Sequence, residues 1–176
     1  IPKESIVENL YNKNKFHMGK TAIEYMERKI TYDELFRNIS IVADSFKKIG
    51  IKKGDIVTVM PLNTPEFLYT YYALNMIGAV TNSIHPLCSK RDIKNYLNEV
   101  NQKFIICSDV NCKVLNDALC EYNSQEKKVI GIIAPISNSI PIGTQIKNIK
   151  NKELVKKSKE LKNNVKNAIK SSNFIM

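Results

Sequence analysis

The sequence lacks several features that would place it in a membrane, secretory or metal-binding class. It contains no apolar run of about 18 residues, so no transmembrane helix is expected. Its amino terminus has no apolar core of a signal peptide, and only two histidines accompany its cysteines. The spacings of Cys88, Cys107, Cys112 and Cys120 match no zinc pattern. We therefore expect no metal site, and free, buried thiols in a reducing cytoplasm.

Clustered glycine is also missing. The six glycines are scattered singly, at Gly19, Gly50, Gly54, Gly78, Gly131 and Gly143. A loop that cradles phosphate groups needs several glycines close together, so that backbone N–H groups can approach the phosphate oxygens. The nearest stretch, Ser137–Gly143, holds one glycine and no adjacent lysine, which favours an ordinary loop over a phosphate cradle.

Positive charge is abundant but unevenly distributed. The net charge is +10 over 176 residues, and residues 147–170 hold nine lysines against two glutamates. Most of the surplus therefore belongs to this lysine-rich segment, and the remainder of the chain is nearly neutral. Residues 153–169 fit an amphipathic helix with a solvated lysine face. A helix that binds an anionic membrane surface or nucleic acid is the alternative, and nucleic acid is the less expected partner because the charge is not spread over a folded face.

Hydrophobic periodicity indicates an α/β fold. Helices are expected from a Ser5 cap to about residue 11 and over residues 31–49, 64–76, 89–100 and 111–122. Strands are expected over residues 21–26, 56–60, 79–83, 104–107 and 129–133, with a turn at 27–29 and a return strand from Ile30. Apolar strands alternating with helices predict an open, mostly parallel sheet with helices on both faces, preceded by a helix and a β-hairpin.

The clearest helix in the sequence follows a capping box, Thr31-Tyr32-Asp33-Glu34. Its predicted buried face comprises Tyr32, Leu35, Phe36, Ile39, Val42, Ala43, Phe46 and Ile49, and Gly50 should end it. Similarly, a helix capped at Ser89 should bury Ile93, Tyr96, Leu97 and Val100. We predict a helix–hairpin–helix region over residues 1–50, a βαβ subdomain over 51–135, and a loop with the lysine-rich helix over 136–176.

Five short motifs occur in a particular order. They are Ile30–Leu35, Lys53–Val57, Asn63–Phe67, Ala73–Val80 and the dipeptide His85-Pro86. Together they resemble the N-terminal part of the adenylate-forming ligases, the superfamily of AMP-forming acyl-CoA synthetases, peptide-synthetase adenylation domains and luciferases. The motif residues are Thr31, Tyr32, Glu34, Leu35, Gly54, Asp55, Asn63, Glu66, Gly78 and Pro86.

The resemblance implies an enzyme that activates a carboxylic acid, here expected to be a fatty acid, as acyl-AMP and transfers the acyl group to CoA. Peptide-synthetase adenylation domains usually carry a Tyr-Pro that Ser83–Ser89 lacks, which favours the acyl-CoA synthetase branch. ATP, Mg²⁺ and CoA are implied for the full-length enzyme, and none is expected bound to this fragment. Its expected partners are the acid substrate and the remaining subdomains of the same multi-subdomain fold.

Motifs that would carry the chemistry are absent from the sequence. It has no phosphate loop ending in Pro-Lys-Gly, no Tyr-Gly-x-Thr-Glu, no Thr-Gly-Asp and no C-terminal domain with the catalytic lysine. No residue is therefore assigned a catalytic role, and the fragment alone is expected to be inactive. His85 stands where the family usually has Asn or Asp, and it is expected to serve the turn or, alternatively, to line a pocket.

Two other hypotheses stay open. The chain could be a non-catalytic α/β binding module whose basic segment binds nucleic acid or anionic lipid. It could also be a degenerate relative used for protein contact, and an exposed apolar face would then make it self-associate.

Overall fold

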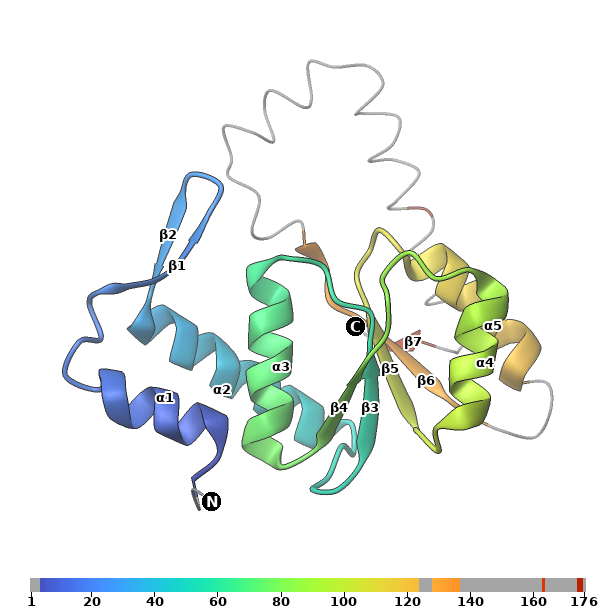
Figure 1. The fold of residues 1–176 in the computed structure, drawn as a ribbon, viewed down its shortest axis with the longest axis horizontal. Helices are drawn as coiled ribbons and strands as arrows, with labels where there is room; N and C mark the ends of the chain where they lie inside the picture. The colour runs from blue at the N-terminus through green and yellow to red at the C-terminus, as the bar shows by residue number, and fades with distance from the viewer. Residues whose placement is uncertain (1–3, 124–127, 137–162, 164–173, 176) are drawn as a thin grey trace. The chain divides into compact units, whose positions relative to one another are not determined.

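The computed structural model describes residues 4–123, 128–136, 163 and 174–175 (Figure 1). The predicted loop Ser137–Gly143 and the predicted helix over 153–169 lie outside these residues, apart from position 163. Backbone contacts group the chain into two compact units. The first unit is Ile1–Asp55 with Asn63–Thr81, and the second is Ile56–Leu62 with Asn82–Met176. The domain limits at residues 50 and 135 stay predictions.

The first unit contains three helices and a hairpin. They are α1 (Ile6–Asn14), β1 (Thr21–Tyr25), β2 (Arg28–Thr31), α2 (Tyr32–Lys48) and α3 (Pro65–Ile77). Helix α2 packs against α3 and crosses it, and α1 also contacts α3 (Figure 1). On α2 the buried residues are Leu35, Ile39, Ala43 and Phe46, which confirms the centre of the predicted face. Its other predicted members are only partly buried, because they lie on the flanks of that stripe.

Two boundaries in the first unit differ from prediction. Helix α1 continues to Asn14 rather than ending near Tyr11. The predicted turn at residues 27–29 is wrong, because Arg28 pairs with Tyr25 and a two-residue loop connects the strands. Met26 takes the left-handed backbone conformation in this loop, with φ of 54°.

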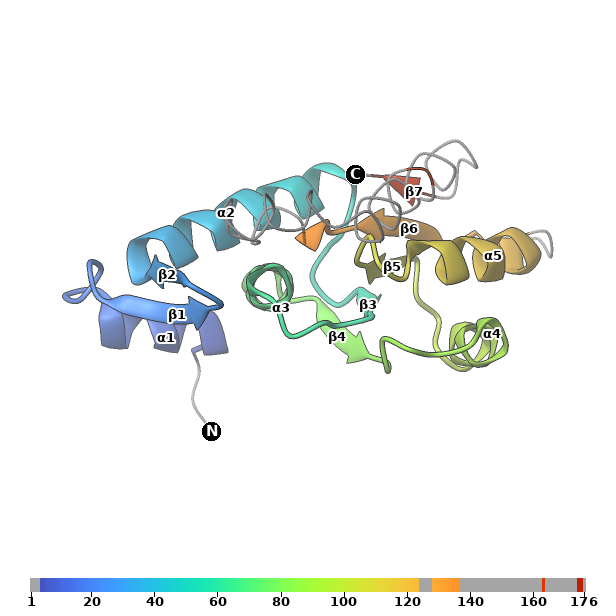
Figure 2. The same ribbon diagram turned by 90° about the horizontal axis from the view of Figure 1, so that it is seen from above.

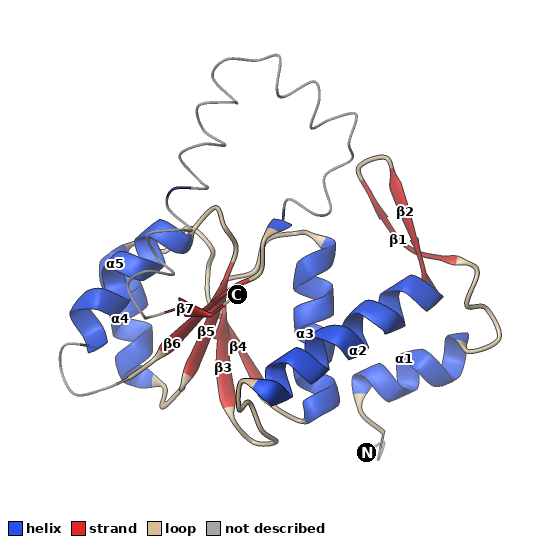
Figure 3. Cartoon of the chain, turned by 180° about the vertical axis from the view of Figure 1, so that it is seen from behind, coloured by secondary structure: helices blue, strands red, loops and turns tan. Residues whose placement is uncertain are grey.

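The second unit is built on the sheet. Its elements are β3 (Ile56–Val59), β4 (Val80–Ser83, whose last two residues belong to this unit), α4 (Lys90–Glu99), β5 (Phe104–Cys107), α5 (Cys112–Asn123), β6 (Ile130–Ile133) and β7 (Phe174–Ile175). The strand order is β4-β3-β5-β6-β7 (Figure 3). The pairs β3–β5, β5–β6 and β6–β7 are parallel. An α/β fold with a mostly parallel sheet flanked by helices, preceded by a helix and an antiparallel hairpin, is thus confirmed.

Apolar side chains from α4, α5 and the sheet form the core of the second unit. Helices α4 and α5 lie side by side next to the sheet (Figure 2). The buried cluster comprises Met60, Ile84, Ile93, Leu97, Ile105, Cys107, Cys112, Leu115, Ala118, Leu119, Tyr122, Val129 and Ile133. Strand residues that point the other way, such as Val57 and Ile106, are buried as well. Burial of both faces explains why these strands are continuously apolar in sequence.

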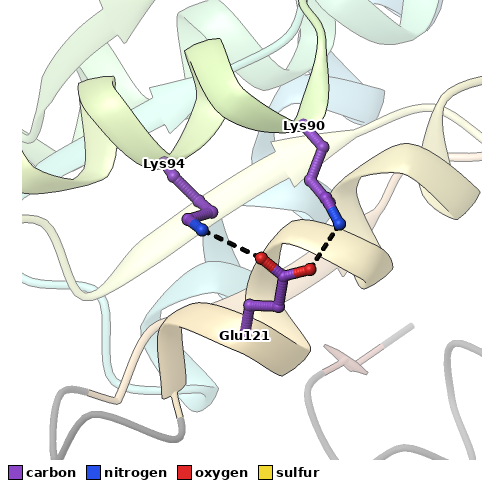
Figure 4. A network of polar contacts seen from close by, with 3 residues as sticks. All are labelled: Lys90, Lys94 and Glu121. Carbon is purple, nitrogen blue, oxygen red and sulfur yellow. Dashed lines mark hydrogen bonds and ion pairs between the residues drawn. The ribbon is translucent and has the colours of Figure 1, made fainter.

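Two residues expected in this core lie outside it. Tyr96 is 37% exposed, because it lies to one side of the Ile93 and Leu97 positions that α4 turns inward. Cys120 is exposed on α5, since the neighbouring Leu119 takes the buried position and successive helical residues point about 100° apart. Helices α4 and α5 are also joined at their surface, where Lys90 and Lys94 form ion pairs with Glu121 (Figure 4).

None of the helices in the described part of the chain is long and apolar enough to cross a membrane.

Candidate functional site

The loops that follow the parallel strands of the second unit lie at one edge of the sheet. Strands β3, β5 and β6 run in the same direction, so their carboxyl ends meet at that edge (Figure 1). The loops after β4, β5 and β6 hold His85 and Pro86, Ser108 to Asn111, and Ala134 to Ile136. Ligands of open parallel sheets bind outside the carboxyl ends of the strands. This carboxyl edge is therefore the candidate site.

Asn111 ties two of these loops together. Its side-chain oxygen accepts hydrogen bonds from the backbone N–H and the hydroxyl of Ser108, both at 2.9 Å. Its side-chain nitrogen donates to the carbonyl of Pro86 at 3.1 Å. Ser108 and Asn111 are only 5% and 6% exposed, so water competes little for these groups. The loop after β5 is thus fixed internally and held against the loop after β4.

Further hydrogen bonds hold the loop after β6 at the same edge. The backbone N–H of Ile136 donates to the carboxylate of Asp109 at 3.3 Å. The N–H of Ala134 donates to the carbonyl of Cys107 at 2.8 Å. Backbone pairing therefore extends beyond the strand ends, and side chains of the Ser108–Asn111 segment reach the loops on either side.

His85 is exposed and takes part in its own turn. Its ring nitrogen Nδ1 accepts the backbone N–H of Leu87 at 3.2 Å, and its carbonyl accepts that of Cys88 at 3.2 Å. These two bonds close a tight turn around Pro86, whose carbonyl is the one that Asn111 holds. One ring nitrogen of His85 is thus engaged locally, and a role for this side chain in a pocket stays a prediction.

The thiols near this edge are poor nucleophiles. Burial raises the pKa of Cys107 well above its ordinary value, and it raises the pKa of Cys112 to about 11, with the carboxylate of Asp109 adding to both effects. Burial, followed by the charge of Asp92, raises the pKa of Cys88. At neutral pH these groups are protonated thiols. The prediction of buried thiols is correct for Cys107 and Cys112, whereas Cys88 is partly exposed.

The motif around Thr31 caps α2 and anchors the hairpin. The Thr31 hydroxyl accepts the backbone N–H of Glu34 at 3.2 Å, which satisfies one of the unpaired donors at the start of the helix. The Glu34 carboxylate forms an ion pair with Arg28 of β2. The ring of Tyr32 stacks on that of Phe36, with centroids 6.2 Å apart. The residues of this motif therefore stabilise the start of α2, its contact with β2 and the packing of its first turns.

The motifs around Gly54 and Gly78 form two facing turns. Both glycines take left-handed conformations, with φ of 85° and 81°. The N–H of Gly54 donates to the carbonyl of Gly78 at 2.9 Å. The Asp55 carboxylate accepts the N–H of Lys52 at 2.8 Å, and its carbonyl accepts that of Val80 at 2.8 Å. These residues shape the chain where it enters β3 and β4.

The remaining motif residues of the first unit surround α3. Leu35 is buried, Asn63 is exposed before the helix, and Glu66 lies in the first turn. Tyr69, one turn further on, has its pKa raised by burial, which outweighs the opposing effect of a hydrogen bond to Asn38. A partly buried polar cluster thus joins α2 to α3 in this unit.

The described residues hold no cluster of metal-binding side chains. Among residues 4–123, 128–136, 163 and 174–175, no three His, Cys, Asp or Glu side chains could hold a metal ion together. The glycines at 19, 50, 54 and 78 do not form a run that could cradle phosphate groups. We therefore derive no catalytic step through ATP or Mg²⁺ from these residues, and the catalytic roles remain unassigned.

Ser108 and Asn111 were not predicted from the sequence. A polar Ser-Asp directly after the apolar strand at residues 104–107, with an Asn just before the next helix, was the available signal. Its meaning depends on Pro86, which is 25 residues earlier in the chain.

Relatives of known name match this chain over part of their length. The acetyl-coenzyme A synthetase of Sinorhizobium medicae is 35% identical over 101 residues, which are 54% of this chain and 16% of that protein. That of Brucella canis is 35% identical over 85 residues, which are 48% of this chain and 13% of the synthetase. The chain therefore corresponds to a minor part of the curated relatives it matches.

Solved structures share the fold. A benzoate CoA ligase from Burkholderia xenovorans LB400 has a TM-score of 0.67 and 18% identity, covering 74% of this chain and 26% of that ligase. The luciferase-like enzyme of the mealworm Zophobas morio has a TM-score of 0.67 and 19% identity, over 79% and 34%. The N-terminal subdomain of Klebsiella oxytoca NpsA, bound to anthranilyl-AMSN, has a TM-score of 0.57 and 27% identity, over 61% and 28%.

The family comparison covers nearly the whole chain. A model built for AMP-binding enzymes matches residues 10–172, which include most of both compact units and the loops at the carboxyl edge. The predicted resemblance to the N-terminal part of the adenylate-forming ligases is thereby confirmed. The chain belongs to the family of AMP-binding enzymes.

Proposed function

We propose that this chain is the N-terminal part of an AMP-forming acid–thiol ligase of the acyl-CoA synthetase type. The full-length enzyme would activate a carboxylic acid with ATP as acyl-AMP, release pyrophosphate and transfer the acyl group to CoA. The observation that carries the proposal is the family match over residues 10–172, together with 35% identity to an acetyl-coenzyme A synthetase. ATP, Mg²⁺ and CoA are accordingly its proposed cofactors and co-substrate, and the cytoplasm its proposed location.

The contribution of this chain is proposed to be structural. Its parallel sheet would form one layer of the enzyme, and the loops at the carboxyl edge would form a wall of the active-site cleft. Support comes from the bonds that hold Asn111 to Ser108 and to Pro86, because a wall that positions substrate must be rigid. We propose that the chain alone is inactive, since no phosphate loop or catalytic lysine motif is found in its sequence.

Exchange of labelled pyrophosphate into ATP by the full-length protein tests this function. Exchange should require a carboxylic acid and Mg²⁺, and thioester should form only when CoA is added. If no acid in a broad panel supports exchange by a folded protein, the proposed function is wrong. The 176-residue chain assayed in parallel should give no exchange, and exchange by this chain would contradict the structural role.

The same assay identifies the carboxylic acid that the full-length enzyme uses. A fatty acid is the proposed substrate, whereas the curated relatives are named for acetate and two structural neighbours for benzoate and for an anthranilyl ligand. The panel should therefore contain acetate, a medium-chain and a long-chain fatty acid, benzoate and anthranilate. A specificity constant at least about tenfold higher for one class, or about 1.4 kcal/mol of transition-state binding, would identify it.

A further inference from the structure

We propose that the loop between α1 and β1 binds an anionic lipid surface. The ring of Phe16 would enter the membrane interface, and the lysines on either side of it would contact lipid phosphate groups. The loop comprises residues 15–20 and lies at the end of the first unit away from α3 (Figure 1). The ligase activity proposed above does not require such a surface, so the inference goes beyond that function.

Phe16 is exposed to an unusual degree for an aromatic residue. It is 85% exposed, more than any other large apolar residue in the described part of the chain. By contrast, Tyr11 on α1 packs edge-on against Phe36, with ring centroids 5.2 Å apart. Apolar surface in contact with water costs free energy, and a ring of this size held outside the packed unit therefore favours an apolar partner.

Lysines flank Phe16 without acidic partners. Lys13 lies in the last turn of α1, Lys15 and Lys20 lie in the loop, and all three are exposed. The sequence contains no Asp or Glu from residue 9 to residue 23. Within the described residues none of the three lysines forms an ion pair. The Nζ atom of Lys15 lies 5.5 Å from the centre of the Phe16 ring, so a cation and the apolar ring share one patch.

Backbone hydrogen bonds hold the loop in place. The N–H of His17 donates to the carbonyl of Asn14 at 2.7 Å, and the N–H of Lys20 donates to the carbonyl of His17 at 2.8 Å. These two successive turns keep residues 14–20 close together. The carbonyl of Lys20 in turn accepts the N–H of Tyr32 at 3.0 Å, which joins the loop to the start of α2. A fixed loop loses little conformational freedom when a partner covers it, which favours binding.

Local structural roles explain only part of this arrangement. Lysines at the end of a helix interact favourably with its dipole, which is sufficient reason for Lys13 and Lys15. Asp33 brings one carboxylate near the loop, because its N–H donates to the carbonyl of Met18 at 3.0 Å. Three lysines against that carboxylate still leave the loop positively charged. Neither Lys20 nor the exposed aromatic ring serves the helix end.

A membrane surface offers partners for both kinds of side chain at adjacent depths. Lysine ammonium groups reach the lipid phosphates while an aromatic ring enters the boundary between headgroups and acyl chains. Anionic lipids of the cytoplasmic leaflet attract such basic segments. Single-stranded nucleic acid fits less well, because its bases stack on successive aromatic rings. Residues 15–20 contain one Phe and no Tyr or Trp.

Sedimentation of the full-length protein with lipid vesicles tests this surface. Vesicles of phosphatidylcholine with about 30% phosphatidylserine are compared with vesicles of phosphatidylcholine alone, which should bind more weakly. We expect Phe16→Ser to weaken binding to the anionic vesicles at least about tenfold. Phe16→Trp should preserve binding, since a Trp ring also favours the interface. Lys15→Gln and Lys20→Gln should each weaken binding about fivefold.

Two matched controls lie on α2 in the same unit. Ile41→Ser removes an apolar side chain from a residue that is 58% exposed, and Lys48→Gln removes an exposed lysine. Lys48 lies about 24 Å along the helix from Tyr32, at 1.5 Å per residue, which is more than a Debye length at physiological salt. Both controls should therefore bind within about twofold of wild type. If Phe16→Ser melts at a lower temperature than wild type, the two lysine variants of the loop decide the question.

Several outcomes overturn the inference. They are no binding of wild type to anionic vesicles, equal losses in Phe16→Ser and Ile41→Ser, and binding that no loop variant weakens, which would assign it to another basic part such as residues 147–170. Loop variants that weaken binding to single-stranded RNA but not to vesicles would identify nucleic acid as the partner. Pyrophosphate exchange by Phe16→Ser without vesicles should equal that of wild type, so failure here is distinguishable from failure of the proposed function.

Discussion

The two compact units differ in whether the residues that organise them can be recognised as motifs in the sequence. All the family-motif residues except Pro86 belong to the first unit, together with the hairpin and α1, α2 and α3. They cap helices, shape turns and pack, as Thr31 does at α2 and Gly54 at the entry to β3. The second unit holds the carboxyl edge of the parallel sheet, and there the organising residues are Ser108 and Asn111, which belong to no motif.

This difference separates motifs that identify a fold from residues that build a site. Turn glycines and helix caps are readable because their chemistry is local, within three or four residues. Residues at a carboxyl edge act across loops that only the sheet brings together. A chain can therefore be assigned to its family mainly from one unit while its candidate site lies in the other.

The largest expected effect comes from a cavity in either core. Ile39 of the first unit and Ile105 of the second are both fully buried, so Ile39→Ala and Ile105→Ala should each lower the free energy of unfolding by about 2–5 kcal/mol. Hydrogen exchange measured by mass spectrometry should accelerate most in the unit that carries the substitution. Equal acceleration of exchange in both units would contradict the division into two units, because the chain would then unfold as one cooperative block.

Removing the Asn111 side chain should have a somewhat smaller effect. Asn111→Ala leaves the buried N–H and hydroxyl of Ser108 without their acceptor and should cost about 2–3 kcal/mol in urea unfolding. Asn63→Ala is the matched control at an exposed motif residue, and it should change stability by less than about 0.5 kcal/mol. A larger loss of unfolding free energy in Asn63→Ala than in Asn111→Ala would contradict the view that Asn111 holds the loops of the carboxyl edge together.

Gly54 tests the local character of the motifs. Its φ of 85° is strained for any residue with a Cβ, although nothing lies within 4 Å of an added Cβ. Gly54→Ala should therefore destabilise by about 1 kcal/mol from backbone strain alone. Gly19→Ala, where φ is not positive and space is also open, should be neutral or stabilise by about 0.4–1 kcal/mol. Thermal unfolding of both variants decides the point, and a loss at Gly19 equal to that at Gly54 would refute the strain argument.

Much of the first unit could be predicted from sequence because its signals are local. The capping box at Thr31 and the apolar stripe through Ile39 located α2 correctly. The polar residues at 27–29 predict a turn there, but Arg28 pairs with Tyr25 and the turn consists of Met26 and Glu27. Here a pairing across the hairpin overrode local composition.

In the second unit the elements were predictable but their assembly was not. The strands around Ile105 and Ile132 were visible as apolar runs. The strand β7 at Phe174–Ile175 was not expected, because a two-residue strand is defined by the partner it pairs with and not by its own pattern. The role of Asn111 depends likewise on a carbonyl 25 residues away. Such long-range pairings leave no periodic signal in the sequence.

The smallest expected effect concerns the surface ion pairs between α4 and α5 (Figure 4). Hydrogen bonds from Lys90 and then Lys94 lower the pKa of Glu121 from 4.5 to about 2. Because the folded-state pKa is the lower one, the stabilisation is fully present above about pH 4.5 and is lost as the pH falls towards 2. The difference in urea midpoint between wild type and Glu121→Gln should therefore be small at pH 7 and vanish near pH 2. Since Glu121 is exposed, about 1 M NaCl should also reduce it, whereas the loss caused by Asn111→Ala should persist in salt. A Glu121→Gln difference unaffected by both salt and acid would mean that the side chain stabilises α5 through packing instead of charge.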